Sequence, residues 1–267
     1  HWVIEQAVIW RHWFQAGYRI GDHIAILRSY TPRENQSLIK HSALRNWTYY
    51  SPHHMDDTSM MLYYRDMQRR QTKALRGYPS SLVLFADYCK RNDLSLPHLK
   101  FCLTASEVLT KQERSLIERV FSVKVYDHYG LAETIVMLHD FGDSIYFNCT
   151  EYGFLELLDT ESPEVKRIIG TNLNNYKFPL LRYDTGDLAI VENNKIIGIL
   201  GRKDQFIFDY NKKVPSVNFY TTFYKVDGIL QWQMVQESKN EICIRLKIDS
   251  RFDSKEVTRK LDSLINI

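Results

Sequence analysis

The sequence predicts an α/β protein with a large N-terminal α/β domain, which includes a β-barrel-like antiparallel part, and a small α+β C-terminal domain. Up to about residue 130, strand-like and helix-like segments alternate, which is typical of a parallel sheet. From residue 135 onward, short strands are separated by turn residues, as in an antiparallel sheet or a distorted barrel. After Gly201 the pattern changes to mixed strands and helices, so we expect a domain boundary at that turn.

The first third of the chain carries helical and strand-like patterns in turn. Apolar residues between 2 and 16 follow helical spacing, and residues 23–27 form a short strand-like run. We expect a second helix over about residues 56–75, which Gly77-Tyr78-Pro79-Ser80 ends. Ser80 is then expected to cap the next helix. The basic residues between 65 and 76 are then interpreted as a solvated helix face.

A strand–helix–strand unit follows and ends at the first candidate motif. Residues 99–103 and 123–126 are expected to be strands, and a capping-box sequence at residues 110–113 opens a helix to about residue 121 between them. Ser106-Glu107 follows the first strand, and Tyr129-Gly130 follows the second. Ligands of parallel sheets bind beyond the carboxyl ends of the strands. Both pairs are therefore predicted at a binding site.

The rest of the chain is expected to be rich in strands. In the large domain they cover residues 135–138, 145–148, 154–158, 188–191 and 196–200, with hairpin signals at residues 142–143 and 193–194. In the small domain we expect strands at 205–208, 230–236 and 242–248, a hairpin at 239–240, and helices at 217–224 and 255–265.

The composition is ordinary for a globular protein. The chain has 267 residues, of which 25% are charged and 44% hydrophobic, with a formal net charge of +3. The four cysteines include no Cys-x-x-Cys pair, so reduced thiols are expected rather than a zinc site. Scattered basic residues argue against a nucleic-acid partner, and the short apolar runs argue against membrane insertion. We expect a cytoplasmic protein.

Three ordered motifs point to one nucleotide site. Tyr129-Gly130-Leu131-Ala132-Glu133 offers a ring that can stack on a base, a glycine that permits close approach, and a carboxylate suited to Mg²⁺. Tyr183-Asp184-Thr185-Gly186-Asp187 places a carboxylate at a glycine turn, where it can accept hydrogen bonds from ribose hydroxyls. In Gly201-Arg202-Lys203-Asp204 the planar, charged guanidinium of the arginine is suited to binding phosphate. Without a nucleotide role, the first motif would be a strand-to-loop turn, the second an Asp-rich turn and the third a charged linker.

In this order and spacing the motifs resemble those of the adenylate-forming enzyme (acyl-CoA synthetase) superfamily. The segments at residues 77–80, 51–52 and 231–237 point to a subgroup that contains phenylacetate–CoA ligase, the capsule-biosynthesis (CapK) proteins and coenzyme F390 synthetase. The resemblance implies a large AMP-binding domain over residues 1–201 that lacks its N-terminal phosphate-loop part. It also implies a small C-terminal domain over residues 202–267, with a hinge at Asp204.

The resemblance also assigns roles to single residues. The side chains expected to contact the nucleotide are Ser106, Glu107, Asp127, Tyr129, Gly130, Asp187 and Arg202. Tyr78, Pro79 and His128 are expected to border the acyl pocket, although a structural role for His128 is an equal alternative. Glu133 and Arg202 are the expected catalytic residues, with Glu133 as the magnesium ligand.

The activity implied by the resemblance is that of an AMP-forming acid–CoA ligase. Its cofactors and partners are ATP/AMP, Mg²⁺, coenzyme A and a small carboxylic acid, and relatives in the subgroup are often homodimers. An aryl acid such as phenylacetate is suggested only by the phenylacetate relative. The sequence contains neither the Ser/Thr/Gly-rich phosphate loop nor the terminal Gly-Lys of the family. The alternative is therefore a non-catalytic member that binds adenylate or a partner in capsule or surface-polysaccharide biosynthesis.

Overall fold

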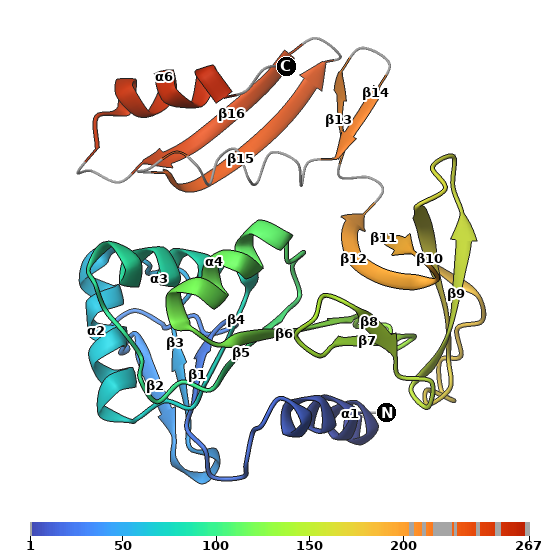
Figure 1. The fold of residues 1–267 in the computed structure, drawn as a ribbon, viewed down its shortest axis with the longest axis horizontal. Coiled ribbons are helices and arrows are strands. Elements are labelled where there is room, and N and C mark those ends of the chain that lie inside the picture. The colour runs from blue at the N-terminus through green and yellow to red at the C-terminus, as the bar shows by residue number, and fades with distance from the viewer. Residues whose placement is uncertain are drawn as a thin grey trace. The chain divides into compact units, whose positions relative to one another are not determined.

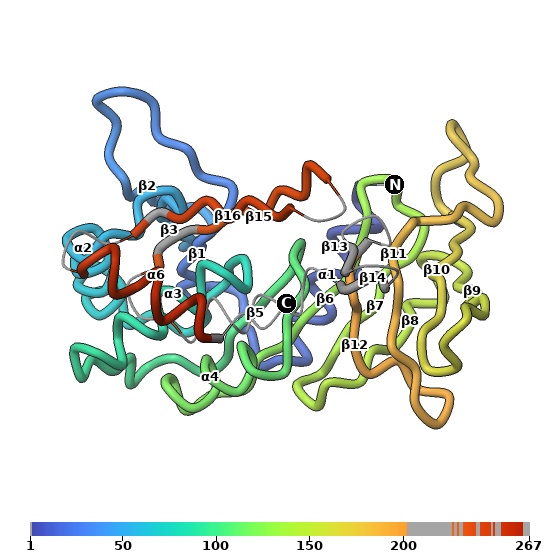
Figure 2. Tube along the Cα trace, turned by 90° about the horizontal axis from the view of Figure 1, so that it is seen from above, coloured from blue at the N-terminus to red at the C-terminus, as the bar shows by residue number. Residues whose placement is uncertain are grey.

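The computed structural model describes residues 2–202, 206–209, 212–215, 226, 229–238, 241–248 and 252–264 (Figure 1). The chain divides into two compact units, His1–Ile199 and Leu200–Ile267. The main feature of the first unit is a sheet with the strand order β2-β3-β1-β4-β5-β6-β7-β8-β12-β11-β10-β9. In Figure 2, β2 lies at one end of this sheet and β9 at the other.

The first part of this sheet is mainly parallel. Its strands are β2 (Ile39–Ser42), β3 (Trp47–Tyr50), β1 (Ile24–Leu27), β4 (Ala74–Gly77), β5 (Phe101–Ala105) and β6 (Lys124–Gly130). All neighbours pair in parallel except β2 and β3, which are antiparallel. Every residue of β1 and of β5 is buried, as expected for parallel strands covered on both faces.

Helices cover both faces of the parallel strands. Figure 1 shows α2 (Asp57–Arg69), α3 (Pro79–Arg91) and α4 (Lys111–Phe121) on one face and α1 (Trp2–Gln15) on the other. On the α1 face, Val8 and Trp13 join Ile24, Ile26 and Phe101 in one hydrophobic cluster. The predicted capping box of α4 is confirmed, because the Thr110 and Glu113 side chains each accept from the other residue's backbone N–H.

The predicted helix over residues 56–75 is wrong from residue 70 onward. The helix ends at Arg69, Gln71 takes a positive φ of 51°, and residues 74–77 form β4 at the centre of the parallel part. The strand β4 has only four residues, and their sequence continues the amphipathic pattern of the preceding helix. The pattern therefore gave no signal for a strand. Arg76 consequently lies in the sheet and is half-buried, rather than on a solvated helix face.

The second part of the sheet is antiparallel, as predicted. Its strands are β7 (Met137–Asp140), β8 (Tyr146–Asn148), β9 (Gly153–Asp159), β10 (Val165–Asn172), β11 (Tyr183–Glu192) and β12 (Lys195–Arg202). The sequence did not predict β10, or the extension of β11 back to Tyr183. Val136, Leu138, Ile168 and Ala189 belong to the buried core of this part.

The second unit contains two hairpins and a helix. They are β13 (Phe206–Asp209) with β14 (Lys212–Pro215), β15 (Ile229–Ser238) with β16 (Glu241–Ile248), and α6 (Ser254–Leu264). Val226, Val257 and Leu261 form its buried core. The predicted helix over residues 217–224 lies outside the described residues. None of the helices in the described ranges has the length and hydrophobicity needed to cross a bilayer.

Candidate functional site

The first two motifs meet through one short hydrogen bond. Tyr129 lies near the end of β6, and the Tyr129 hydroxyl donates to the Asp187 Oδ2 atom on β11 at 2.6 Å. Burial and the Asp187 charge raise the pKa of Tyr129, so the phenol stays protonated and acts as the donor. Asp187 is only 8% exposed. Two sequence motifs that are 58 positions apart therefore form one polar centre.

A second contact joins the same motifs. The Tyr183 hydroxyl donates to Glu133 Oε1 at 3.5 Å, the outer limit of a hydrogen bond. Glu133 lies in the turn between β6 and β7, just before Thr134, which takes a positive φ of 58°. The Glu133 carboxylate is half-buried and faces the start of β11. The predicted magnesium ligand thus lies close to the second motif.

A bulge in β11 shapes the Asp187 position. The pairing of β10 with β11 shifts between Arg167 and Ile169, so residues 185–187 together face a single residue of β10. Gly186 takes a positive φ of 75°, which glycine adopts without strain. The Asp187 N–H donates to Thr185 Oγ1 at 3.0 Å, which holds the bulge closed. Bulges of this kind re-aim a side chain and are common beside active sites.

Ser106 and Glu107 lie just beyond the carboxyl end of β5, as predicted. Ser106 takes a positive φ of 74° and accepts a hydrogen bond from Arg28 Nη2 at 3.1 Å. The Glu107 carboxylate accepts from the Ser80 N–H in the first turn of α3 at 3.1 Å, where a negative charge is favourable. This pair therefore links the edge of the sheet to the start of α3.

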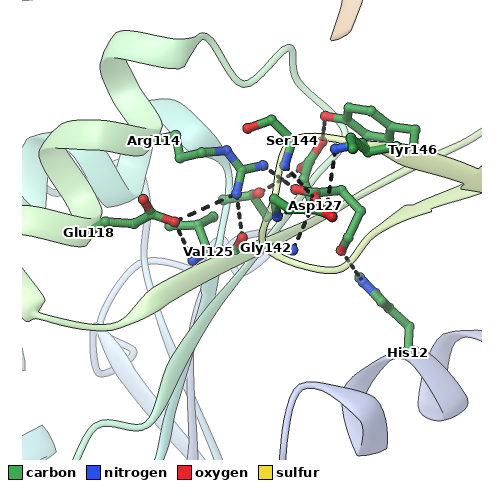
Figure 3. Close-up of polar contacts among 12 residues, drawn as sticks. His12, Arg114, Glu118, Val125, Asp127, Gly142, Ser144 and Tyr146 are labelled. Atoms are coloured by element: carbon green, nitrogen blue, oxygen red, sulfur yellow. Dashed lines mark hydrogen bonds and ion pairs between the residues drawn. The ribbon is translucent and has the colours of Figure 1, made fainter. Parts of the chain in front are cut away.

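Asp127 is placed differently from its prediction as a nucleotide ligand. Its carboxylate is 3% exposed and accepts hydrogen bonds from Thr104 Oγ1 and the Tyr146 hydroxyl, both at 2.6 Å (Figure 3). Burial raises the pKa of the Asp127 carboxyl from 3.8 to about 6. With both oxygens bonded inside the protein, Asp127 fixes β6 against its neighbours instead of facing a ligand edge.

A buried polar network that the sequence did not predict lies beside Asp127 and also supports β6. Arg114 of α4 forms an ion pair with Asp140 of β7 and donates to the Val125 carbonyl of β6 (Figure 3). Asp140 is fully buried, and one of its oxygens accepts the backbone N–H groups of residues 142–144. The Asp140 carbonyl also contacts His12 of α1 at 2.7 Å. The only sequence signal was the turn at residues 142–143.

The residues predicted at the acyl pocket gather around two arginines. Tyr78 caps the start of α3, its hydroxyl lies 3.1 Å from Ser29 Oγ, and Arg28 stacks over its ring at 5.3 Å. Pro79 is buried at the first position of α3. Burial, aided by the nearby charge of Arg76, keeps the pKa of His128 well below its usual value, so its ring is neutral. Sequence reasoning did not single out either arginine as a site residue.

The remaining predicted residues are less defined. Gly130 is exposed, and an added Cβ would approach no atom closer than 3.8 Å, so the chain itself imposes no need for glycine there. That room agrees with close approach of a ligand. Arg202 ends β12, but its side chain is outside the described residues, as is the whole of Asp204.

One curated protein resembles the chain in sequence, although no family model matches it. Protein CapK of Staphylococcus aureus is 25% identical over 224 residues, which cover 79% of this chain and 50% of that protein. The chain thus spans about half the length of the curated relative that it matches.

Solved structures are similar over nearly the whole chain. A 2-hydroxyisobutyryl-CoA ligase in the postadenylation state has a TM-score of 0.65 and 14% identity, covering 96% of this chain and 62% of that chain. McyG A-PCP complexed with phenylalanyl-adenylate has a TM-score of 0.62 and 13% identity, covering 94% and 55% of the two chains. The anthranilate CoA ligase AuaEII has a TM-score of 0.61 and 13% identity, covering 93% and 53%. These structures confirm the predicted fold class, and the sequence comparison confirms the predicted resemblance to CapK.

Proposed function

Since the chain has the fold of the adenylate-forming enzymes and resembles CapK in sequence, we propose that it is part of an AMP-forming ligase. The protein would activate a carboxylic acid with ATP to an acyl-adenylate and pass the acyl group to coenzyme A. The proposal includes the domain assignment, with the AMP-binding part over residues 1–201 and a hinge at Asp204. An aryl acid such as phenylacetate is the first substrate to test.

The observation that carries the proposal is the contact between Tyr129 and Asp187. It brings an aromatic ring and a buried carboxylate together at the carboxyl end of β6, where parallel sheets bind their ligands. In this role the Tyr129 ring stacks on adenine, and Asp187 accepts from the ribose hydroxyls. A carboxylate has about four acceptor positions, so the bond from Tyr129 fixes its orientation and is compatible with further donors.

Glu133 fits the part of a magnesium ligand. Among the described residues, no group of three or more His, Cys, Asp or Glu side chains is arranged to hold a metal ion by itself. Mg²⁺ bound to a nucleotide differs from such sites, because one or two carboxylates and the phosphates suffice. The half-buried Glu133 carboxylate, held by one long hydrogen bond from Tyr183, suits that requirement. When bound, the ion supplies charge stabilisation to the phosphates.

The proposed chemistry needs no side-chain nucleophile. The carboxylate oxygen of the acid attacks the α-phosphorus of ATP, and the bond to pyrophosphate breaks. The sulfur of the coenzyme A thiolate then attacks the acyl carbon, and AMP leaves. The protein contributes by holding the reacting atoms in line and stabilising phosphoryl charge. Tyr129, Gly130 and Asp187 hold the nucleoside, and Arg202 is the proposed cationic partner of the phosphates.

Carboxylate-dependent ATP–pyrophosphate exchange by the full-length protein tests this function. We expect exchange with at least one acid of a broad panel, and its loss in Asp187→Ala. The matched control is Asp143→Ala, which removes an exposed carboxylate from the turn after β7. Absence of exchange with every acid, in a protein that is folded and binds AMP, would refute the ligase proposal.

The likeness to CapK favours one second candidate. In that reading the protein binds adenylate, or a partner, without catalysis and serves surface-polysaccharide assembly. Equilibrium dialysis with labelled AMP, run beside the exchange assay, separates the two candidates. AMP binding that depends on Asp187, without exchange, supports the binding protein, whereas both signals together support the ligase.

A further inference from the structure

Two arginines lie at the carboxyl ends of neighbouring parallel strands, outside the motifs used so far. Arg28 directly follows β1, and Arg76 is the third residue of β4. The strands pair in register, with Arg76 opposite Ile26 of β1 and Leu103 of β5. Both side chains are half-buried at the edge of the sheet where ligands bind.

The Arg76 guanidinium has no hydrogen-bond acceptor among the described residues. Its ring contact is with Trp13, whose face lies 4.7 Å away, but among the described residues no hydrogen bond or ion pair reaches the guanidinium. Burial lowers the pKa of Arg76 to about 9, and the Arg28 charge contributes to this fall, so the group is still charged at neutral pH. A half-buried cation with five N–H donors and no acceptor from the described residues is partly desolvated, which costs free energy. This cost is removed when an anion binds.

Arg28 has only partial compensation. It donates a hydrogen bond to Ser106 Oγ and stacks on Tyr78. Burial lowers the pKa of Arg28, and the negative charge of the nearby Glu107 carboxylate opposes this fall. Glu107 also accepts from the Ser80 N–H. The two arginines, one glutamate and neutral His128 therefore leave a net positive charge at this edge of the sheet.

The position of the pair relative to the nucleotide motif limits what it binds. His128 and Tyr129 are consecutive on β6, so their side chains point to opposite faces of the strand. The Tyr129 side leads to Asp187, whereas the charges of Arg76 and Arg28 act on His128. A group bound by the arginines therefore lies on the opposite face of β6 from the Tyr129–Asp187 contact.

On this basis we propose that Arg28 and Arg76 bind a second carboxylate of the acid substrate, so that the protein acts on a dicarboxylic acid. This inference rests on the proposed ligase function. The reacting carboxylate is a poorer occupant, because two arginines that bind it before the reaction stabilise the ground state and slow its attack on phosphorus. A distal carboxylate has no such conflict. The planar guanidinium also matches a carboxylate in a bidentate pair, which binds and orients the acid.

Paired acids of equal chain length test the inference on the full-length protein. The pairs are pentanoate with glutarate, hexanoate with adipate, and 4-methylphenylacetate with 4-carboxyphenylacetate. Binding is measured by calorimetry in the presence of AMP, and turnover by ATP–pyrophosphate exchange. In at least one pair, we expect the dicarboxylate to bind roughly ten- to hundredfold more tightly than its partner, the range of charge-assisted hydrogen bonds.

Variants then locate the preference. Arg76→Gln should remove it while changing AMP and monocarboxylate affinity less than about twofold, and Arg76→Lys should restore part of it. Arg28→Gln is the second variant, in case the first does not fold. Arg45→Gln is the matched control, because Arg45 also stacks on a tryptophan, Trp47 at 5.0 Å, but on the exposed surface. The control should keep the preference.

The outcomes separate this inference from the proposed function. Dicarboxylate binding that Arg76→Gln abolishes, without exchange by any acid, supports the anion site and refutes the ligase. Exchange without any preference for dicarboxylates keeps the ligase and overturns the inference. Equal weakening of mono- and dicarboxylates in Arg76→Gln also overturns it, because the pair then holds the reacting carboxylate. The inference is also overturned if Arg76→Gln raises only the KM for coenzyme A.

Discussion

Replacing Asp127 by asparagine should change how the stability of the first unit depends on pH. The native carboxyl is buried between Thr104 and Tyr146, and burial raises its pKa from 3.8 to about 6. Between these values the folded protein holds the proton and the unfolded chain has released it. The carboxyl's contribution to the free energy of unfolding therefore falls as pH rises through this window.

The size of the effect follows from the shift of the Asp127 pKa. Two pKa units correspond to roughly 3 kcal/mol, of which about 2 kcal/mol lies between about pH 4.5 and 7.5. The asparagine side chain of the variant does not titrate, and the hydroxyls of Thr104 and Tyr146 can each turn to donate or accept. The difference in unfolding free energy, Asp127→Asn minus wild type, should therefore increase by about 2 kcal/mol over this range.

Urea unfolding followed by tryptophan fluorescence at several pH values measures this difference. Four of the five tryptophans, at positions 2, 10, 13 and 47, report on the first unit. Asp56→Asn is the control of opposite sign, because hydrogen bonds from Ser59 lower the pKa of that exposed carboxyl, and its contribution is lost as pH falls. A difference that stays constant with pH for Asp127→Asn would refute the reasoning. Unchanged AMP affinity in the same variant is expected, because the Asp127 carboxylate is buried and both of its oxygens accept hydrogen bonds within the protein.

Three further predictions concern the same strands. Asp187→Ala should weaken AMP binding at least roughly tenfold in equilibrium dialysis, because charge-assisted hydrogen bonds contribute about 1.5–3 kcal/mol each. Arg114→Met should lower the free energy of unfolding by about 3–5 kcal/mol in urea titrations, because it leaves Asp140 as a buried charge without its cation; a loss below about 1 kcal/mol would contradict this. Glu133→Gln should raise the Mg²⁺ concentration for half-maximal exchange roughly tenfold and leave AMP binding without Mg²⁺ unchanged; an equal loss in both assays would count against a metal ligand.

The shared site of Tyr129 and Asp187 was predictable only from the order and spacing of the motifs and their resemblance to a known family, because the two residues are 58 positions apart. Local signals predicted features that form within a few residues. The glycine turn at Gly186 has a positive φ, and both hydrogen bonds of the α4 capping box form within one turn. Such features depend on neighbours in the chain.

Features that depend on distant partners were not predictable. β4 is a four-residue strand whose conformation comes from pairing with β1 and β5 on either side, so its own pattern resembled the helix before it. The same error concealed Arg76, whose burial comes from Trp13, 63 positions earlier in the sequence. The ion pair between Arg114 and Asp140 joins a helix to a strand across 26 positions and has no local signature.

Gly153 gives a test of how the Glu133 turn is supported. It is the first residue of β9, and a Cβ atom added there would lie 1.6 Å from the Ile135 carbonyl oxygen, which is a backbone atom. Gly153→Ala must therefore move either β9 or the segment that begins two residues after Glu133. We expect a loss of about 3 kcal/mol or more, and a melting temperature lower by roughly 6–12 °C.

The control is another glycine of the antiparallel strands. In Gly198→Ala the new Cβ atom would lie 3.6 Å from Ile190 Cδ1, an ordinary contact, so the melting temperature should change by less than about 2 °C. Neither glycine has a positive φ, so the comparison isolates the steric effect. Because Ile135 lies two residues after Glu133, a shift of Ile135 also disturbs the Glu133 turn, and Gly153→Ala should raise the Mg²⁺ requirement for exchange at temperatures where it is folded. Equal melting temperatures for the two variants would show that Ile135 does not contact β9 in this way.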